Sequence, residues 1–482
     1  MTELPAVSCL AELVELRAER AGAACFVAAD GSRSLSYADL RNAAQDWRAH
    51  FSDRRLPAGP IGLAIGDPLE FARAFVGLLA AGARIAPLDP AAPAAARAED
   101  AADLGLVALL TDDGLAVRHS TRRDSPLPDR GGGASVLLRS SGTTGRRKQI
   151  LLGEHQLLHT AGTVATHHEL RPQDRGLCTL PLFHVNAEVV GLLSTLVAGA
   201  SLVLDDRFHR STFWPTAIRT GVTWINAVPA ILAILSREPA PPGIAKRIRF
   251  ARSASAPLPT AVLDRFEAVT GIPVLETYGM TEGASQLTAN PLRGPRRAGS
   301  VGLPVGCELR VVDQGRPVRP GITGSVEVRG PGVVPGPLPD RWLVTGDLGY
   351  LDGDGYLFLT GRVDDVINRG GEKIFPRTIE EVLLEDDAVA DAVAVGVTHD
   401  VLGSVPVACV TPTTAATSGH RPEPAVIAAQ LRALVENRLA RNCRPVRIDI
   451  VPGLPTGPTG KISRRLVRES LDELAAHALA SA

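Results

Sequence analysis

The strongest chemical signal in this sequence lies in one short segment, residues 139–148 (RSSGTTGRRK). An unbroken run of hydroxyls and glycines lets its backbone turn sharply and approach a ligand. Hydroxyl and amide groups suit anionic oxygens, and the cations at its end add positive charge. The apolar residues 134–138 before it are typical of a buried strand, so the run would follow a strand end, where open α/β sheets bind ligands. We interpret the segment as a phosphate-binding loop in preference to a solvated turn, with these candidate residues: Ser140, Ser141, Gly142, Thr143, Thr144, Gly145 and Lys148.

The common nucleotide-binding motifs do not account for this loop. Its glycines are too closely spaced for the pattern G-x-x-x-x-G-K-[ST], and the Gly460–Lys461 pair is followed by Ile462 instead of a hydroxyl residue. No G-x-G-x-x-G follows an expected strand. A simple P-loop ATPase and a Rossmann dehydrogenase are therefore both disfavoured.

A second cluster, residues 276–285 (ETYGMTEGAS), combines an aromatic ring, a hydroxyl and a carboxylate. Tyr278 could stack on a purine and Thr281 could donate to a phosphate. Glu282 among phosphates would suit Mg²⁺, which takes oxygen ligands from carboxylates and phosphates together. A polar loop that caps a helix, with Thr281 as the N-cap, explains the same pattern equally well.

Three further positions carry weaker signals. Asp347 lies in WLVTGDLGY, where a carboxylate could bind ribose hydroxyls or stabilise its own turn. Arg362 and Asp364 lie in GRVDD. His184 follows an aromatic residue in PLFHVNA, and such a histidine is more often a packed core residue than a catalyst. The chain lacks a G-x-S-x-G elbow and a cysteine nucleophile with an evident base, so hydrolase triads are disfavoured.

Lysine is rare in this chain, because only four of the 51 cations are lysines. The surviving lysines should be enriched where a compact ammonium is needed in place of a planar guanidinium. Three of them lie in glycine-rich segments, although chance survival is the alternative: Lys148, Lys373 and Lys461.

Composition sets the broad class of protein. A chain of 482 residues is long enough for two to four domains, and its net charge of −1 implies neither a nucleic-acid nor a membrane-surface partner. Six scattered cysteines without a C-x-x-C suggest neither a zinc site nor a redox pair. The N-terminus lacks a secretory pattern, and the longest apolar stretch, residues 189–204, is short and interrupted. We expect a cytoplasmic protein without a membrane span.

Apolar runs and amphipathic segments alternate along most of the chain, which predicts an α/β fold with parallel sheets. Between residues 60 and 111 the order is strand (61–64), helix (68–81), strand (83–87), helix (92–104) and strand (107–110). Strands are also expected over 224–227 and 406–410, and a buried helix that leads into a strand is expected over 189–204. Residues 306–330 instead predict small antiparallel or barrel-like structure. The clearest boundary lies near residues 361–365. We expect an N-terminal domain over 1–361, a hinge at 362–364 and a C-terminal α+β domain over 365–482.

In this order and spacing, these segments resemble the adenylate-forming superfamily, which contains acyl-CoA synthetases, nonribosomal-peptide adenylation domains and firefly luciferase. The likeness runs from residues 79–90 (LAAGARIAPLDP) to residues 454–464 (LPTGPTGKISR). It implies a large N-terminal domain of parallel αβα sheets with a small β-barrel-like subdomain. It also implies a small C-terminal α+β domain on a hinge.

The resemblance assigns the ATP site by position. The loop from Ser140 to Lys148 would hold the β- and γ-phosphates of ATP. Tyr278 would pack on adenine, Thr281 would contact the α-phosphate and Glu282 would hold Mg²⁺.

The same resemblance assigns residues nearer the C-terminus. Asp347 and Arg362 would bind the ribose hydroxyls, and Asp364 would be the hinge of the C-terminal domain. Lys461 would contact both the substrate carboxylate and the α-phosphate. A rotation at the hinge would replace the Lys461 face by one that carries the residues of the thiol step, Gly370 and Gly371 with Lys373.

The activity that the resemblance implies is ATP-dependent adenylation of a small carboxylic acid and transfer of the acyl group to a thiol, expected to be coenzyme A. The branch of oxalate and other small-acid CoA ligases is most similar, although Ser285 stands where that branch typically has histidine. His184 would line the acyl pocket. Two alternatives stay open: transfer of the activated acid, or of another oxyacid such as nitrite, to a separate carrier protein or an amine, and a nucleotide-binding regulator without catalysis.

Overall fold

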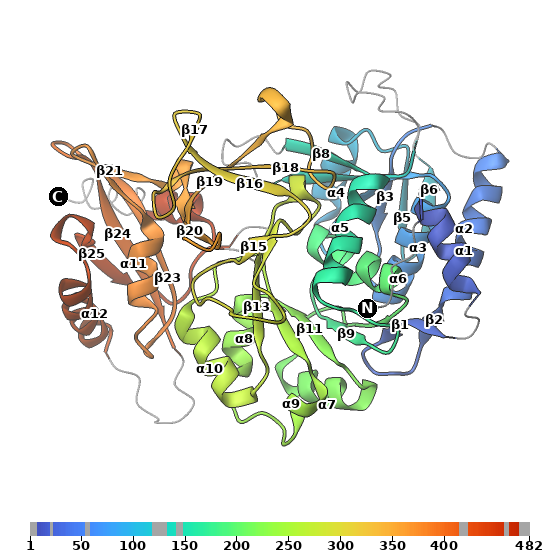
Figure 1. Ribbon diagram of the computed structural model, residues 1–482, viewed down its shortest axis with the longest axis horizontal. Coiled ribbons are helices and arrows are strands. Elements are labelled where there is room, and N and C mark those ends of the chain that lie inside the picture. The colour runs from blue at the N-terminus through green and yellow to red at the C-terminus, as the bar shows by residue number, and fades with distance from the viewer. Residues whose placement is uncertain are drawn as a thin grey trace. The chain divides into compact units, whose positions relative to one another are not determined.

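The computed structural model describes residues 7–19, 23–53, 58–117, 133–140, 148–413, 423–456 and 462–471. The chain divides into two compact units (Figure 1). The first unit comprises Met1–Leu258, Val262–Leu309 and Glu327–Leu343. The second unit comprises Pro259–Ala261, Arg310–Val326 and Val344–Ala482.

A nine-stranded sheet is the largest of the first unit. Its central strands pair in parallel, whereas β2, β14 and β15 at its two edges pair antiparallel. In spatial order the strands are β15 (Leu303–Pro304), β14 (Thr288–Ala289), β13 (Val274–Tyr278), β12 (Phe250–Ser253), β11 (Trp224–Ala227), β9 (Arg175–Cys178), β10 (Ser201–Leu204), β1 (Ala24–Ala28) and β2 (Ser34–Ser36).

A six-stranded sheet is the other large sheet of this unit. Strands β5, β3, β4 and β7 pair in parallel, and each outer strand pairs antiparallel with its neighbour. The order is β6 (Gly114–Val117), β5 (Ala108–Thr111), β3 (Ile61–Ala64), β4 (Arg84–Pro87), β7 (Ser135–Ser140) and β8 (Lys148–Gly153).

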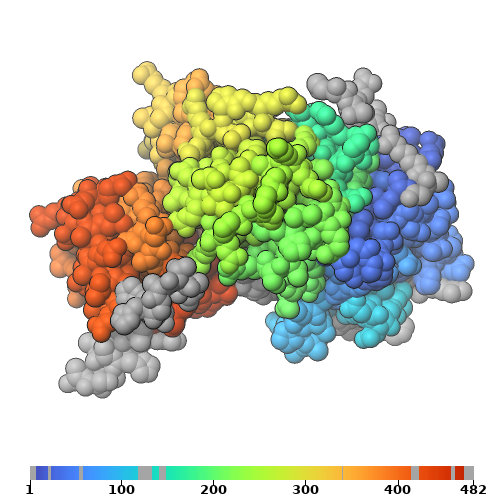
Figure 2. All heavy atoms as spheres, turned by 90° about the horizontal axis from the view of Figure 1, so that it is seen from below, coloured from blue at the N-terminus to red at the C-terminus, as the bar shows by residue number. Residues whose placement is uncertain are grey.

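Helices cover both sheets, and α3 contacts strands of each. Figure 2 views the protein from below Figure 1, with the green to yellow-green atoms of the segment that contains α7, α9 and α10 toward the viewer. The helices of this part of the chain are α1 (Leu10–Ala18), α2 (Tyr37–Ser52), α3 (Pro68–Ala80), α4 (Ala94–Asp103), α5 (Glu154–His167), η1 (Asn186–Leu193), α6 (Ser194–Ala198), α7 (Arg210–Thr220), α8 (Pro229–Leu235), α9 (Ile244–Arg247), α10 (Thr260–Thr270), and the short η2 (Thr281–Gly283) and η3 (Pro339–Arg341).

Helix α3 shows why these residues form this element. Asp67 at its N-cap accepts hydrogen bonds from the backbone N–H groups of Leu69 and Glu70, at 2.9 and 3.1 Å. Pro68 occupies the first helical position, where its fixed φ is favourable and its missing N–H costs nothing. Most of the helix is buried in one continuous apolar core that also includes strands of both sheets. Burial on nearly every side explains why its sequence is almost wholly apolar.

The other sheets are built from later segments. A five-stranded sheet has the order β17 (Arg316–Pro317), β16 (Glu308–Asp313), β18 (Gly324–Arg329), β19 (Leu343–Leu351) and β20 (Leu357–Arg362). A second five-stranded sheet contains β22 (Glu372–Ile374), β21 (Ile367–Arg369), β24 (Gly403–Pro412), β23 (Val389–His399) and β25 (Arg447–Ile450). Two helices and two short helical turns belong to the same region: α11 (Pro376–Leu383), α12 (Pro424–Arg438), η4 (Val363–Asp365) and η5 (Arg441–Cys443).

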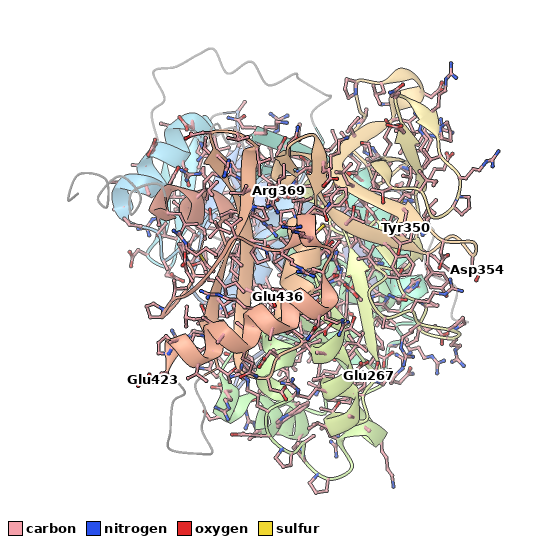
Figure 3. All side chains as sticks on the ribbon, turned by 90° about the vertical axis from the view of Figure 1, so that its left-hand side faces the viewer. Glu267, Tyr350, Asp354, Arg369, Glu423 and Glu436 are labelled. Atoms are coloured by element: carbon pink, nitrogen blue, oxygen red, sulfur yellow. The ribbon has the colours of Figure 1, made fainter. Side chains whose placement is uncertain are left out.

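The last sheet is buried on both faces. Ala392 and Ala394 of β23 belong to a core with α11 and α12, whereas Val393 and Val395 belong to a core on the other face. Figure 3 shows α12, with Glu423 and Glu436 labelled, and Arg369 on β21. Because side chains alternate along a strand, this arrangement explains the continuous apolar sequence of β23.

The structure confirms most of the expected elements. Strands 61–64 and 224–227 were expected over the same residues as β3 and β11. The apolar stretch 189–204 forms helical residues that lead into β10, as expected. Among the described segments, no helix is both long and apolar enough to cross a lipid bilayer.

Candidate active site

The phosphate-binding loop connects two paired strands. Ser140 at the end of β7 is in register with Lys148 at the start of β8, so the chain between them closes a hairpin. Because β7 runs parallel to β4, this hairpin lies at the carboxyl edge of the parallel strands, where ligands bind. Lys148 is exposed. The predicted phosphate-binding residues in between, Ser141, Gly142, Thr143, Thr144 and Gly145, lie outside the described residues.

Arg139, the first residue of this segment, has a structural partner. Its guanidinium forms ion pairs with Asp100 and, at 2.6 Å, with Asp103, both on α4. The pairing attaches β7 to α4. Arg139 therefore contributes little free positive charge to a phosphate.

The second cluster forms a tight turn between β13 and β14. A Cβ on residue 279 would lie 1.3 Å from the carbonyl oxygen of Ser285, so only glycine permits this chain path. The N–H of Leu287 donates to the carbonyl of Tyr278 at 2.9 Å and closes the turn. Thr281 is already the first residue of η2, and Met280 holds the capping position without a side-chain bond. The interpretation of Thr281 as an N-cap is therefore wrong.

The turn presents two polar side chains for chemistry. Thr281 and Glu282 are both half-buried. Within the described segments the Thr281 hydroxyl has no hydrogen-bond partner and the Glu282 carboxylate has no ion-pair partner. The backbone carbonyl of Glu282 accepts a hydrogen bond from Val334 at 2.7 Å, which fixes the residue. A fixed carboxylate without a cation fits the requirement of Mg²⁺ for oxygen ligands.

Strand β8 lies against η2. The fold therefore brings β8, the second strand of the phosphate-binding hairpin, beside the turn that carries Thr281 and Glu282. These segments are more than a hundred residues apart in the sequence.

His184 precedes a π-helical segment, η1. It is half-buried, and its ring lies 4.5 Å from that of Phe183. Its carbonyl accepts a hydrogen bond from the N–H of Glu188 at 3.1 Å, which starts the helix. π-Helical turns are rare and occur frequently at functional sites.

A buried polar cluster surrounds Arg252 on β12. Its Nη1 donates to the side-chain oxygens of Asn186 and Asn226, at 3.0 and 3.1 Å, and its Nε donates to that of Gln286 at 3.2 Å. Asn186 in turn donates to the hydroxyl of Ser255 at 3.2 Å. The sequence analysis missed this cluster, because its members come from four segments. For two members the available signal was a polar residue inside an apolar strand: Asn226 in WINA and Arg252 in FARS.

The charge of Arg252 helps to lower the pKa values of two adjacent histidines. His167 and His168 face each other through their Nδ1 atoms at 3.0 Å. Burial and then the charge of Arg252 lower the pKa of His167. Burial, His167 and Arg252 lower the pKa of His168 well below its usual value. Both rings are therefore neutral at pH 7.

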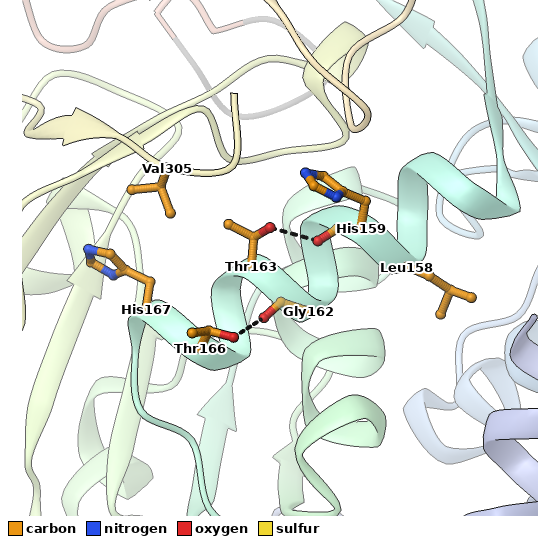
Figure 4. A pocket seen from close by; sticks show the side chains of 7 residues that line it. All are labelled: Leu158, His159, Gly162, Thr163, Thr166, His167 and Val305. Carbon is orange, nitrogen blue, oxygen red and sulfur yellow. Dashed lines mark hydrogen bonds between the residues drawn. The ribbon is translucent and has the colours of Figure 1, made fainter. Parts of the chain in front are cut away.

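His167 also lines a groove along α5 with a cavity volume of about 580 Å³ (Figure 4). The hydroxyls of Thr163 and Thr166 donate hydrogen bonds to the backbone carbonyls of His159 and Gly162, one helical turn earlier, at 2.8 and 2.9 Å. These threonines present mainly their methyl groups, so the groove suits an apolar chain better than an anion. Its lining residues are Leu158, His159, Gly162, Thr163, Thr166, His167 and Val305.

In the second unit, Asp347 and Arg362 are directly opposite each other on β19 and β20. Their side chains approach to 3.6 Å, and the carboxylate is only 14% exposed whereas the guanidinium is 46% exposed. The N–H of Asp347 donates to the Thr345 hydroxyl at 3.1 Å. A carboxylate and a guanidinium at this spacing could accept and donate hydrogen bonds to two neighbouring hydroxyls.

The other predicted residues of this unit are exposed. Asp364 lies in η4, directly after β20. Gly370 and Gly371 form the turn of the β21–β22 hairpin with φ of 59° and 94°, and Lys373 follows on β22. Lys461 lies outside the described residues.

Comparisons with known proteins agree with this geometry. The model of the family "AMP-binding enzyme" matches residues 14–337, and that of the "AMP-binding enzyme C-terminal domain" matches residues 378–461. The chain is 42% identical over 357 residues to a sulfoacetate–CoA ligase of Cupriavidus necator, a match that covers 70% of this chain and 68% of that protein. It is 38% identical over 359 residues to an oxalate–CoA ligase of Arabidopsis thaliana, covering 71% of this chain and 68% of that protein.

A solved structure has the same fold. ATP-bound MatB from Rhodopseudomonas palustris superposes with a TM-score of 0.82 at 25% identity, covering 96% of this chain and 99% of that chain.

Proposed function

This chain belongs to the AMP-binding enzyme family, and we propose on that premise that it adenylates a small carboxylic acid with ATP and passes the acyl group to coenzyme A. The predicted resemblance to adenylate-forming enzymes is confirmed. ATP, Mg²⁺ and coenzyme A are the expected reactants and metal of such an acid–thiol ligase.

One observation of the structure carries the proposal. Strand β8, which directly follows the hydroxyl-rich segment, packs against η2, which carries a hydroxyl and a carboxylate without a partner among the described residues. This arrangement would place phosphate contacts and a metal ligand at one point, as an attack on the α-phosphorus of ATP requires.

In the first half-reaction the substrate carboxylate attacks the α-phosphorus and pyrophosphate leaves. Two anions must approach, so fixed positive charge and positioning supply most of the catalysis. The Thr281 hydroxyl would donate to an α-phosphate oxygen, and Glu282 would hold Mg²⁺. Bound Mg²⁺ would neutralise charge on the phosphates. Lys461 would bridge the two reacting anions, and Asp347 with Arg362 would hold the ribose.

In the second half-reaction the thiol of coenzyme A attacks the acyl carbon and AMP leaves. We assign Gly370, Gly371 and Lys373 to this step and Asp364 to the hinge that changes the face of the C-terminal domain (365–482) toward the rest (1–361). The exposed position of the hairpin supports this assignment. His184 would line the acyl pocket.

The acceptor is assigned to coenzyme A because the curated relatives described above are CoA ligases. A separate carrier protein or an amine would need the same first half-reaction and differs only in the second.

The test is an ATP–pyrophosphate exchange screen of the purified full chain over small mono- and dicarboxylic, sulfonated, aromatic and amino acids. We expect exchange that depends on the acid and on Mg²⁺, and formation of AMP and the acyl-CoA thioester once coenzyme A is added, followed by mass spectrometry. ADP as the product, or no exchange with any acid, would contradict the proposal. Exchange without thioester formation would reject coenzyme A as acceptor and leave adenylation standing.

A further inference from the structure

Arg252 carries a buried positive charge without a counter-charge. The residue is 1% exposed, and its three hydrogen-bond acceptors, Asn186, Asn226 and Gln286, are all neutral. Throughout the described part of the chain, no carboxylate lies within 4.0 Å of its guanidinium. Buried charges in proteins are normally paired, because removing an ion from water is costly.

The neighbouring titratable groups do not supply the missing charge. Burial raises the pKa of the Cys178 thiol to about 11, so it is neutral. His167 and His168 have lowered pKa values and are neutral. Arg249 is itself a cation and pairs with Asp174 at 2.7 Å. Burial lowers the pKa of Arg252 to about 9, so the guanidinium stays charged at pH 7.

The guanidinium also keeps unused donors. A guanidinium has five N–H groups, and the three hydrogen bonds occupy Nε and Nη1. Nη2 forms no hydrogen bond with any residue that the structure describes. Two N–H groups on one nitrogen are therefore left for an anionic oxygen.

The cluster connects the segments that the proposed adenylation uses. Gln286 directly follows the turn of Thr281 and Glu282, and Asn186 lies two residues after His184. Asn186 also binds Ser255, three residues after Arg252. The charge thus lies beside the predicted acyl pocket, and not on the segments assigned to phosphate or ribose.

We propose, resting on the adenylation proposed above, that Arg252 binds a second anionic group of the acid substrate, so that the enzyme selects small acids with two negative charges. The reacting carboxylate needs its lone pairs for attack on phosphorus, whereas a second carboxylate or sulfonate has no such role and can take the guanidinium permanently. An acid with an uncharged tail would leave the buried charge unpaired, which gives the discrimination a physical basis.

The test compares isosteric pairs of acids in the exchange assay. Oxalate is paired with oxamate, malonate with malonamate, and sulfoacetate with methylsulfonylacetate, so that each pair differs in one charge. We expect the wild-type kcat/KM for the preferred dianion to exceed that for its uncharged-tail partner by about 100-fold or more, as for a charge-assisted contact in a buried site. The carboxylate and sulfonate arms show which anion the cluster prefers.

Variants of Arg252 locate the effect. In R252M the advantage of the dianion falls to within about threefold, through a higher KM for the dianion. R252K keeps the charge but loses the planar guanidinium that binds Asn186, Asn226 and Gln286 while Nη2 stays available, so its preference should fall between those of wild type and R252M. Melting curves of both variants report whether they fold, and R252K serves alone if R252M does not.

Three results would overturn the inference. A wild-type enzyme without preference for dianions excludes it. Equal losses for both members of each pair in the variants indicate a structural role for Arg252 only. If R252M exchanges pyrophosphate at the wild-type rate with every acid, Arg252 does not bind the substrate, while the proposed adenylation is not contradicted. Absence of exchange with any acid in the wild-type enzyme would instead reject the proposed adenylation itself.

Discussion

The Arg252 cluster of the first unit and the segment 361–374 of the second unit differ in how they hold their polar residues. Around Arg252, four side chains from four segments are buried and hydrogen-bonded: Asn186, Asn226, Arg252 and Gln286. In segment 361–374 the predicted functional residues are mostly exposed and lie on η4 and one hairpin. The side chains of a buried cluster are held in one arrangement, whereas the residues of an exposed hairpin can still contact another surface of the protein or a ligand.

The difference fits the two half-reactions. Adenylation needs charge that is fixed before the reactants arrive, which a buried cluster and a tight turn supply. In the mechanism proposed above, the thiol step uses residues that act only after the C-terminal domain has changed position. Variants in the two regions should therefore separate the half-reactions.

The largest effect should come from Lys461→Ala. Removing the ammonium that bridges the two anions should slow ATP–pyrophosphate exchange by about 100- to 1,000-fold. Thioester formation from supplied acyl-AMP should stay near the wild-type rate, since that step does not use Lys461. Lys246→Ala, an exposed lysine on α9, is the matched control. Near wild-type exchange in Lys461→Ala would remove the lysine from the mechanism.

Glu282→Gln should follow, with a loss of about 100-fold in exchange, because the amide is a poorer ligand for Mg²⁺ than the carboxylate. Raising the Mg²⁺ concentration should restore part of the activity. Glu99→Gln, exposed on α4, should change nothing. If added Mg²⁺ has no effect on the variant, Glu282 is not a metal ligand.

Asp347→Asn tests a residue that combines features of the two regions, since its carboxylate is mostly buried, as in the Arg252 cluster, but belongs to the second unit. Loss of the charged acceptor should raise KM for ATP by about tenfold with kcat little changed. Asp354→Asn is the matched control, an exposed aspartate in the turn that joins β19 to β20 (Figure 3). An unchanged KM would leave Asp347 with a role only in its contact with Arg362 across β19 and β20.

Gly371→Ala should affect only the thiol step. Residue 371 has a φ of 94°, and a Cβ there meets no atom within 4 Å, so the substitution strains the hairpin backbone without a clash. Strain of this kind costs about 1–3 kcal/mol, and we expect thioester formation to slow by about fivefold or more. Exchange should be unaffected, as in the control Gly353→Ala, which is open and has no positive φ. A parallel loss of exchange would refute the separation.

The smallest effect should be on stability, through Glu188. Neither carboxyl oxygen of this residue has a partner in the described segments, and burial raises its pKa well above the ordinary 4.5. The unfolded chain ionises this group near pH 4.5 while the folded protein keeps its proton, so rising pH destabilises the fold by about 1.4 kcal/mol per pH unit within that window.

Glu188→Gln removes the ionisable group. The melting temperature of Glu188→Gln, compared with that of the wild type, should therefore rise as the pH increases above the ordinary value of 4.5. Glu15→Gln, exposed on α1, should show no such trend. A difference between Glu188→Gln and wild type that is constant with pH would mean that Glu188 does not carry a raised pKa.

The sequence predicted the elements whose signal is local. Strands β3 and β11 are short apolar runs bounded by turns, and both were placed over the correct residues. Strand β24 was expected over 406–410 but spans Gly403–Pro412, because pairing with β23 extends it beyond its apolar run. The antiparallel outer strands, such as β6 and β14, were missed, since their pairing is set by neighbours in space.

The same limit applies to the site. Tyr278, Thr281 and Glu282 could be proposed because they lie within five residues of one another. The Arg252 cluster could not, because its hydrogen bonds join residues that are 26 to 69 positions apart. No local sequence feature distinguishes Arg252 from the other arginines. Only the fold shows that it is buried without a counter-charge.

The π-helical segment after His184 has a consequence for how relatives of this enzyme can diverge. A π turn holds one residue more than an α turn, and each residue of an α-helix turns the chain by about 100°. Deleting a single residue between 186 and 193 would let the segment relax to an ordinary helix and would rotate Asn186 away from the guanidinium. The deletion of one residue in this segment could then change which acid is bound, even though every side chain of the pocket is retained.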